Sequence, residues 1–292
     1  MHFQEMSSTM NRPLAFQIKN LSCRYPNSES DVLEISNLDI PSGSMTFIVG
    51  SSGVGKSTIL ETLGLMNNTA VLSTDSIFNF YPLKEENPIE LGSIWKESEG
   101  YLSQFRNSHL SFIFQNTNLF PTLSANENAI VSLVLQGEEK SLAIEKSRKL
   151  FREILPELKG DRSISELSGG QRQRLAFIRA MISNFTVLLA DEPTGNLDLA
   201  NAKALINNIK MQLYDRTAII VSHDISLAME FADQIVLIKK IKVNVTGKSK
   251  GNISNDTIYF RKDHNLWIKN EKPISSEDVF FDLMQSIQIN EA

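Results

Sequence analysis

Three groups of residues in this chain have the types and spacing needed to bind a phosphorylated nucleotide and a divalent cation. The first fits the pattern G-x-x-x-x-G-K-[ST] and reads Gly50-Ser51-Ser52-Gly53-Val54-Gly55-Lys56-Ser57, with Thr58 next. In this pattern the glycines let backbone N–H groups curl around phosphate oxygens, and the lysine charge reaches the β and γ phosphates. The serine hydroxyl binds Mg²⁺. The sequence therefore predicts a site for ATP and Mg²⁺ at this phosphate loop.

The second group is a pair of acids at the end of an apolar run. Residues 187–190 read Val-Leu-Leu-Ala and lead directly into Asp191 and Glu192. One carboxylate cannot both hold a metal ion and act as a base, and adjacent acids allow the two tasks to be divided. We expect Asp191 to hold Mg²⁺, directly or through water, and Glu192 to polarise the water that attacks the γ phosphate. The pair predicts Mg-dependent hydrolysis of ATP to ADP and phosphate.

The third group is Leu167-Ser168-Gly169-Gly170-Gln171, which precedes apolar residues at helical spacing, Leu175, Ile178 and Ile182. A helix that starts with Ser-Gly-Gly has no bulky side chain over its first N–H groups, so its positive end can bind an anion. The phosphate loop already supplies this chain with a phosphate site. The second anion-binding helix end is best explained as serving the ATP that is bound to another copy of the chain.

The order of these groups resembles that of an ATP-binding cassette, the ATPase subunit of ABC transporters, over roughly residues 14–241. Residues 106–115, 118–123 and 191–198 are similar to the lipoprotein-release, macrolide-efflux and cell-division branch of that family. Two features depart from the family pattern. Ile178 stands where a small residue is usual, and residues 248–292 match no part of the family that we can place.

The resemblance implies roles for three more residues near the nucleotide. Gln115 falls at the position of the glutamine that contacts Mg²⁺ and the attacking water, and His223 at that of the switch histidine that contacts the γ phosphate. Tyr25 falls at the position of an aromatic residue that stacks on adenine. Outside this context, each of the three would also fit a purely structural role.

The resemblance also implies two kinds of partner. In the family, cassettes close head to tail, so Ser168, Gly169, Gly170 and Gln171 would bind the ATP of a second copy. The segment Gly195-Asn196-Leu197-Asp198 would cross the dimer interface, which makes Asp198 a further nucleotide-site residue. In relatives of the same branch, the neighbourhood of residues 106–123 forms the groove that receives a helix from the membrane subunit.

The elements that must position these residues follow from the hydrophobic pattern. Apolar runs predict short strands around residues 16–18 and 32–40 and buried strands at 45–49, 110–114, 186–190, 218–221 and 235–238. Helical spacing follows the phosphate loop over 57–66, and Ser124 with Glu127 forms a capping-box pattern before a helical stretch at 126–156. We expect residues 67–108 to form an irregular insertion on the surface, because they show no clear period.

These elements predict an α/β fold: a phosphate-loop ABC ATPase core, with a mostly parallel sheet and flanking helices, plus N-terminal antiparallel strands and a helical subdomain at about residues 116–180. We expect residues 1–247 to form the nucleotide-binding domain and residues 248–292 a C-terminal extension with a hairpin and a helix from about Ser276. That helix would carry Val279, Phe280, Leu283 and Ile287 on one side. We expect this apolar stripe to serve local packing rather than a partner.

Composition limits the classes of partner and the compartment. The 292 residues carry a formal net charge of -5, which does not favour nucleic acid as a partner, and one cysteine, Cys23, which suits a reducing cytoplasm. Residues 1–12 do not resemble a secretory signal, and no stretch has the roughly 20 apolar residues that a membrane span needs. We therefore expect a peripheral protein at the cytoplasmic face of the inner membrane, which reaches the membrane through an integral membrane subunit.

The sequence leaves more than one function open. The leading hypothesis is a homodimeric ATPase subunit that closes around ATP and drives a separate membrane subunit, for export or for transmitting force across the membrane. An alternative is a soluble cassette ATPase that acts on nucleic acid or ribosomes, although such relatives usually insert a long coiled coil or carry two cassettes. A third is a monomeric phosphate-loop NTPase or kinase. The transported substrate cannot be named from the sequence.

Overall fold

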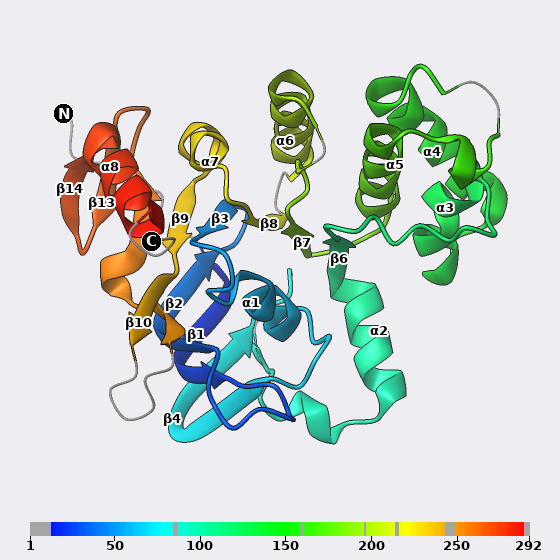
Figure 1. Ribbon diagram of the computed structural model, residues 1–292. Helices are drawn as coiled ribbons and strands as arrows, with labels where there is room; N and C mark the ends of the chain where they lie inside the picture. The colour runs from blue at the N-terminus through cyan, green and yellow to red at the C-terminus, as the bar shows by residue number, and fades with distance from the viewer. Residues whose placement is uncertain are drawn as a thin grey trace, which may run out of the picture.

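The computed structural model of the chain describes residues 13–83, 87–158, 161–195, 197–213, 216–242 and 249–288. Two sheets occupy its centre, and the helices cover them or gather in a separate lobe (Figure 1). Three expectations fall outside the described residues: those for residues 1–12, for Asn196 and for the domain boundary between residues 247 and 248.

The larger sheet has eight strands in the order β14-β13-β12-β9-β3-β8-β7-β6, and its middle is parallel. Every residue of β3 and β8 is buried, as expected for strands that are covered on both faces. This confirms the mostly parallel core that the apolar runs predicted. The parallel strands are β3 (Met45–Val49), β6 (Leu110–Ile113), β7 (Val187–Asp191), β8 (Thr217–Val221) and β9 (Gln234–Leu237).

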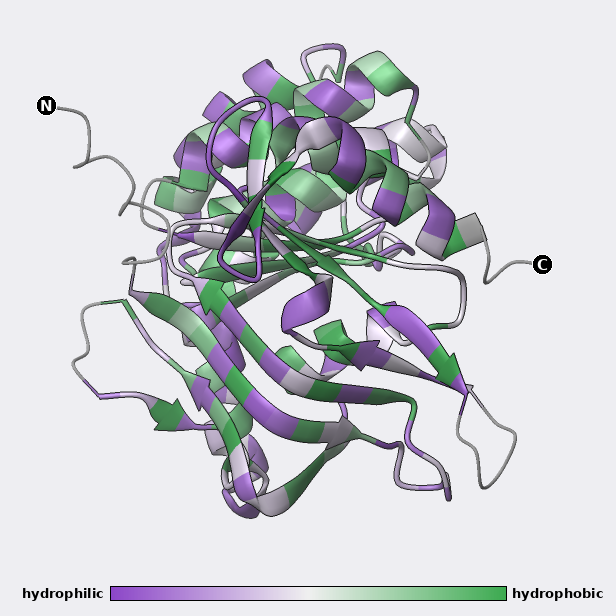
Figure 2. Cartoon of the chain, turned by 90° about the vertical axis from the view of Figure 1, so that its left-hand side faces the viewer, coloured by the Kyte–Doolittle hydropathy of each residue, from purple (hydrophilic) through white to green (hydrophobic). Residues whose placement is uncertain are grey.

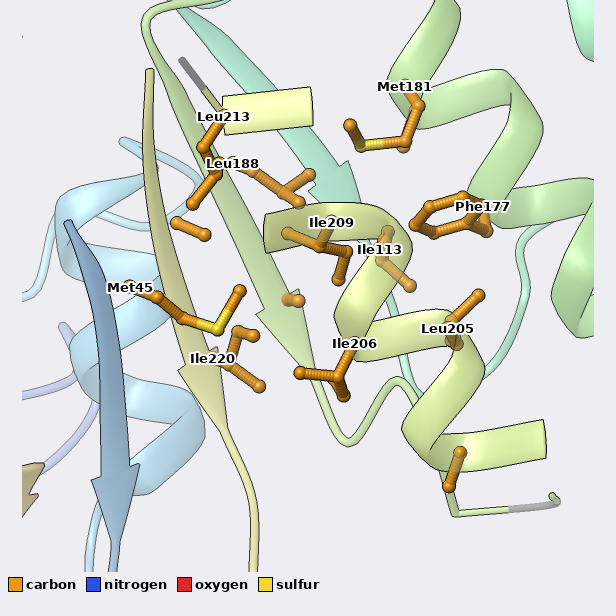
Figure 3. Close-up of a cluster of buried hydrophobic side chains, with 14 of the residues drawn as sticks. Met45, Ile113, Phe177, Met181, Leu188, Leu205, Ile206, Ile209, Leu213 and Ile220 are labelled. Atoms are coloured by element: carbon orange, nitrogen blue, oxygen red, sulfur yellow. The ribbon is translucent and has the colours of Figure 1, made fainter. Parts of the chain in front are cut away.

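Helices pack against this sheet through apolar faces. In α6 (Leu199–Leu213), the side chains of Ile206 and Ile209 point toward Ile220 on β8 (Figure 3). The same cluster takes in Phe177 from the neighbouring helix α5 (Gly169–Ile182), and all four of these residues are fully buried. Helix α1 (Lys56–Leu63) follows β3, and helix α7 (Ile225–Phe231) follows β8. Helix α1 ends at Leu63, a turn earlier than the predicted residue 66.

The second sheet has the order β10-β11-β2-β1-β4-β5 and contains the N-terminal antiparallel strands that the sequence predicted. Hydrophobic and hydrophilic residues alternate along its long strands (Figure 2), so one face packs on the core and the other faces outward. Its strands are β1 (Leu14–Cys23), β2 (Leu33–Pro41), β4 (Ala70–Phe80), β5 (Ile89–Glu90), β10 (Lys239–Lys242) and β11 (Ser249–Ile253).

The prediction of an irregular insertion at residues 67–108 is wrong. This segment forms strands β4 and β5, the short helix η1 (Ile94–Lys96) and helix α2 (Glu99–His109). Its hydrophobic signal is weak because β4 is largely exposed over its first half and buries Phe78 and Phe80 only near its end. Helix α2 likewise buries just Leu102 and Phe105, which lie one turn apart.

A helical lobe lies to one side of the sheets and contains α3 (Ala125–Leu135), α4 (Lys140–Ile154) and α5 (Gly169–Ile182) (Figure 1). The capping box predicted at Ser124 and Glu127 is present at the start of α3. The single helical stretch predicted over 126–156 is wrong in one respect, because the chain turns between α3 and α4 at Gly137. Gly137 has φ 89, a left-handed conformation that glycine adopts at little cost. The short helix η2 (Ile164–Glu166) leads into α5.

The C-terminal extension continues both sheets. Strand β11 pairs with β2, while β12 (Ile258–Arg261), β13 (Leu266–Lys269) and β14 (Lys272–Ser275) extend the larger sheet beyond β9. The short helix η3 (Asn255–Thr257) precedes β12, and α8 (Ser276–Gln288) follows β14.

The apolar face of α8 differs from the predicted stripe. Val279 and Leu283 are fully buried, but Phe280 is 40% exposed, because it lies one residue out of register with the face that packs on the sheet. Among the described residues, no helix has the length and apolar character to cross a membrane.

Candidate functional site

The phosphate loop connects the end of β3 to the start of α1, as the pattern requires. Gly53 and Gly55 have φ values of 71 and 103, a left-handed conformation that a side chain would strain. A Cβ atom on Gly50 would lie 2.9 Å from Val54 Cγ1 and 3.0 Å from the carbonyl oxygen of Ile238. Glycine is therefore required at these three positions, twice for backbone conformation and once for close packing.

Lys56 is held inside the curve of this loop. Its Nζ donates to the carbonyl oxygens of Gly50 at 2.8 Å and Ser51 at 2.9 Å. Ser51 and Val54 are buried behind the loop, while Ser52 is exposed at its front. The loop thus places a positive charge beside the N–H groups at the start of α1, an arrangement that favours a bound phosphate.

Ser57 and Asp191 bring two oxygen ligands together. The Ser57 hydroxyl donates to Asp191 Oδ2 at 3.0 Å, across 134 residues of sequence. Burial raises the pKa of Asp191, and the nearby charge of Glu192 raises it further, while the Ser57 hydrogen bond and the Lys56 charge lower it. Hydroxyl and carboxylate oxygens are the donors that Mg²⁺ prefers, so this pair fits the ion.

A Mg²⁺ ion at this place would not need a larger cluster of protein ligands. Among the described residues, no group of three or more His, Cys, Asp or Glu side chains could hold a metal. Mg²⁺ usually keeps several waters and binds through one or two carboxylates together with the phosphates of the substrate. Ser57 and Asp191 match that mode of binding.

Glu192 and His223 face each other at the ends of neighbouring strands. His223 Nδ1 lies 2.8 Å from Glu192 Oε2, and the Glu192 side chain is 12% exposed against 71% for His223. The Glu192 N–H donates to the carbonyl of Val221 at 3.0 Å, which ties the end of β7 to the end of β8. Glu192 has φ 48, a left-handed conformation that costs a residue with a side chain about 1–3 kcal/mol. Such strain is typical of functional sites.

Gln115 joins the phosphate loop and the acids around one cavity of about 280 Å³. Gln115 is exposed and lies two residues beyond the end of β6. Val32 also lines the cavity, although sequence reasoning treated it only as a strand residue, because nothing in the pattern shows that the start of β2 reaches the loop. The lining residues are Val32, Ser52, Gly53, Gly55, Lys56, Ser57, Thr58, Gln115, Asp191 and Glu192.

Tyr25 lies beside α1 rather than in the lining of this cavity. Its hydroxyl donates to Glu61 Oε2 at 2.8 Å and lies 3.3 Å from Thr58 Oγ1. Burial is the main cause that raises the pKa of Tyr25. These contacts fix the ring near the first turns of α1, and stacking on adenine stays a prediction.

The segment Ser168–Gln171 begins α5 in the helical lobe and is absent from the described lining of the phosphate-loop cavity. The Ser168 hydroxyl accepts from the Gln171 N–H at 3.2 Å, and the Gln171 side chain accepts from the Ser168 N–H at 2.9 Å. A Cβ atom on Gly169 would meet no described atom within 4 Å, and one on Gly170 would lie 3.7 Å from Leu197 Cδ2. The packing of this chain therefore does not require either glycine.

Asp198 directly precedes α6 and caps its start, and its side chain is exposed. Its carboxylate accepts from the Asn201 N–H at 2.9 Å and from Asn201 Nδ2 at 2.6 Å. These hydrogen bonds lower the pKa of Asp198. The structure gives Asp198 a helix-capping role, and its place in a dimer interface stays a prediction.

A second cavity, of about 500 Å³, lies between α2, β6, α3 and α5 and contains the apolar side chains of Phe112, Phe114 and Leu135. Arg179 of α5 borders it and is only 8% exposed. Its guanidinium donates to the carbonyls of Asn118 at 2.7 Å and Thr117 at 2.9 Å. Arg179 thus fastens the helix that starts at Ser168 to the segment that follows Gln115.

Comparison with known proteins places this geometry in a family context. The family model described as ABC transporter matches residues 33–195, more than half of the chain. The macrolide export ATP-binding/permease protein MacB of Pasteurella multocida (strain Pm70) is 34% identical over 233 residues. That match covers 79% of this chain but 34% of MacB, so the chain spans about a third of the length of this relative. MacB belongs to the macrolide-efflux branch that the motifs indicated.

Solved structures give the same result. The ABC transporter cassette MJ0796 in its dimeric form is 27% identical, with a TM-score of 0.63 and coverage of 76% of this chain and 93% of that chain. The same cassette in a post-hydrolysis dimer bound to ADP and Pi is 26% identical, with a TM-score of 0.62 and the same coverage. The protein cbiO1 of Clostridium perfringens, 21% identical with a TM-score of 0.66, covers 92% of this chain and 91% of its own and shows the fold alone.

Replacing Asp191 with Asn should stabilise the chain at neutral pH in the absence of nucleotide. Burial raises the pKa of Asp191, so its ionised form costs native stability, whereas the amide can still accept from Ser57. As the pH falls through this raised pKa, the native wild type binds a proton before the unfolded chain does, and its stability approaches that of the variant. Urea unfolding at several pH values measures the gap; a gap that widens toward acid pH contradicts the prediction.

The matched control is Asp198→Asn. The pKa of Asp198 is lowered, so its carboxylate contributes stability above its unfolded pKa and loses it as the pH falls through the lowered value. We expect this variant to be slightly less stable than wild type at neutral pH and equal to it in acid. The opposite signs of the two stability changes distinguish a half-buried carboxylate from an exposed one.

Proposed function

The chain belongs to the ABC transporter family of ATP-binding cassettes, and we propose that two copies of it close around ATP to drive a separate membrane subunit. The observation that carries this proposal is the start of α5, where Ser168 caps the helix and a Cβ atom on Gly169 would meet no described atom within 4 Å. A helix N-terminus whose first two residues are glycines leaves room for a phosphate, and this chain already has its own phosphate loop. Two copies arranged head to tail would supply each loop with the helix end that it lacks.

ATP hydrolysis is the activity of the family, and the residues around the 280 Å³ cavity divide the work. Lys56 and the N–H groups of the loop would hold the phosphates, and Ser57 and Asp191 would hold Mg²⁺. Mg²⁺, when bound, neutralises charge on the β and γ phosphates. Glu192 would accept the proton of the attacking water as the bond between the γ phosphorus and the ADP oxygen breaks. His223 would orient Glu192 through the 2.8 Å contact, and Gln115 lines the same cavity as Glu192.

The 500 Å³ cavity suits the contact with the membrane subunit. Leu135 is 71% exposed and Phe120 is 47% exposed at this cavity, so an incoming apolar helix face would remove both side chains from water. The Arg179 hydrogen bonds connect the cavity to α5 and to the segment after Gln115. We place the protein at the cytoplasmic face of the membrane, and leave open whether the partner exports a substrate or transmits force.

Replacing Glu192 with Gln should abolish turnover without preventing dimerisation. The amide keeps the shape of the side chain but cannot take a proton from water, so ATP would stay bound and hold the closed pair together. Size-exclusion chromatography with light scattering, with and without ATP and Mg²⁺, measures the dimer, and phosphate release measures turnover. Glu230→Gln, at an exposed ion pair with Lys203, is the control and should hydrolyse ATP normally. Rapid hydrolysis by Glu192→Gln would remove Glu192 from its proposed role.

Mixing two inactive variants should restore activity. Ser168→Phe blocks the helix end of one copy, and Lys56→Ala disables the phosphate loop of the other. A mixed dimer still contains one intact pair, the loop of the first chain with the helix end of the second. Phosphate release by each variant alone and by the mixture is the measurement. Normal activity of Ser168→Phe alone would favour a monomeric NTPase instead.

Replacing Leu135 with Asp should weaken the association with the membrane subunit and spare basal ATP hydrolysis. The change puts a charge into an apolar contact that must lose water when the partner binds. Met211→Asp is the matched control, because Met211 is 68% exposed on α6 and lies away from the cavity. Affinity purification from membranes compares how much of the integral partner each variant retains. Equal recovery with both variants would contradict the proposed docking site.

A further inference from the structure

Strand β11 of the C-terminal extension reaches the region behind the phosphate loop. It pairs in parallel with β2 and in antiparallel with β10, so it lies between these two strands in the smaller sheet. Gly251 lies opposite Leu33, and its N–H donates to the carbonyl of Val32 at 2.8 Å. Val32 is the residue of this segment that lines the phosphate-loop cavity. Strand β11 is thus hydrogen-bonded directly to a residue that lines the phosphate-loop cavity.

Gly251 also brings the backbone of β11 directly against the loop. A Cβ atom at this position would lie 2.2 Å from the carbonyl oxygen of Val54, 2.8 Å from Ile238 Cγ2 and 2.9 Å from Leu33 Cδ1. The nearest of these is a backbone atom, which cannot rotate away as a side chain can. Gly251 does not have a positive φ, so closeness rather than backbone conformation explains the glycine.

The contacted carbonyl lies at a sensitive point. Val54 is 3% exposed and directly precedes Gly55, the N-cap residue of α1. A shift of the Val54 carbonyl would move the Gly55–Lys56 peptide, and with it the N–H groups and the ammonium group that face a phosphate. The loop therefore has a rear surface that β11 covers and a front surface that holds the ligand.

We propose that β11 is a rear support for the phosphate loop and that Gly251 is a positioning residue for nucleotide binding. Lys250 helps to keep the strand in place, because its Nζ lies 2.6 Å from Glu34 Oε2 on β2. By linkage, anything that lifts β11 from β2 weakens nucleotide binding, and bound nucleotide holds β11 in place to the same degree. The C-terminal extension can in this way regulate the ATP site without contacting ATP. The proposal rests on residues 50–57 being the nucleotide site.

The test is the binding of ADP with Mg²⁺ to the full chain, measured by isothermal titration calorimetry. Gly251→Ala adds one methyl group against the Val54 carbonyl, and we expect the Kd to rise roughly tenfold, equal to about 1.4 kcal/mol. Asn252→Ala is the matched control on the same strand and should leave the Kd within about twofold of wild type. A folded Gly251→Ala chain with wild-type affinity would overturn the proposal.

A third variant separates this proposal from its premise. Lys56→Ala should lose ADP binding; if it binds like wild type, the nucleotide site itself is misplaced, and the proposed function fails together with the support role. If Lys56→Ala loses binding while Gly251→Ala keeps it, only the support role fails.

A milder variant covers the case in which Gly251→Ala does not fold, as judged by its urea unfolding curve. Lys250→Ala removes the ion pair with Glu34 and adds no atoms, so it weakens the pairing of β11 without a clash. We expect a Kd about twofold higher, as suits a partly exposed pair, and faster hydrogen exchange at residues 53–57. Unchanged exchange at these amides would overturn the proposal.

Discussion

The structure depends on the meeting of three parallel strand ends at one edge of the larger sheet. Strands β3 and β7 both pair in parallel with β8, so the residues that follow these strands must emerge side by side. That topology alone brings the phosphate loop, the Asp191–Glu192 pair and His223 together from distant parts of the sequence. The hydrogen bond from Ser57 to Asp191 closes the arrangement, because it joins the first turn of α1 to the end of β7.

Gathering charges at this edge works against stability. Asp191 loses water and feels the negative charge of Glu192, and both effects raise its pKa, while Glu192 adopts a left-handed backbone conformation. The apolar residues beneath the site offset these costs, since β3 and β8 are buried along their whole length. Lys56 and the Ser57 hydroxyl compensate part of the charge from within the site. The protein therefore keeps a locally unfavourable arrangement, which the proposed binding of a cation and phosphates would offset.

The sequence predicted best what depends on local pattern and least what depends on tertiary register. The phosphate loop, the acidic strand end and the Ser124 capping box are local, and the structure places all of them on the expected elements. Strand β4 was missed because half of it faces solvent, so its burial does not alternate in a recognisable way. The positions of Val32 beside the cavity and of Gly251 behind the loop could not be predicted from the sequence, because they depend on the pairing of β2 with a strand more than 200 residues later.

Gly169 and Gly251 show how one residue type can mark two different constraints. Neither has a positive φ, so backbone conformation does not explain either glycine. The difference between them lies in what a Cβ atom would contact at each position. At Gly251 the backbone of the phosphate loop fills that space, which means that the chain completes this part of the site by itself. At Gly169 the space meets no described atom of the chain. The rear of the phosphate loop is thus built within one copy, whereas the start of α5 stays open at Gly169, as the proposed head-to-tail pair requires.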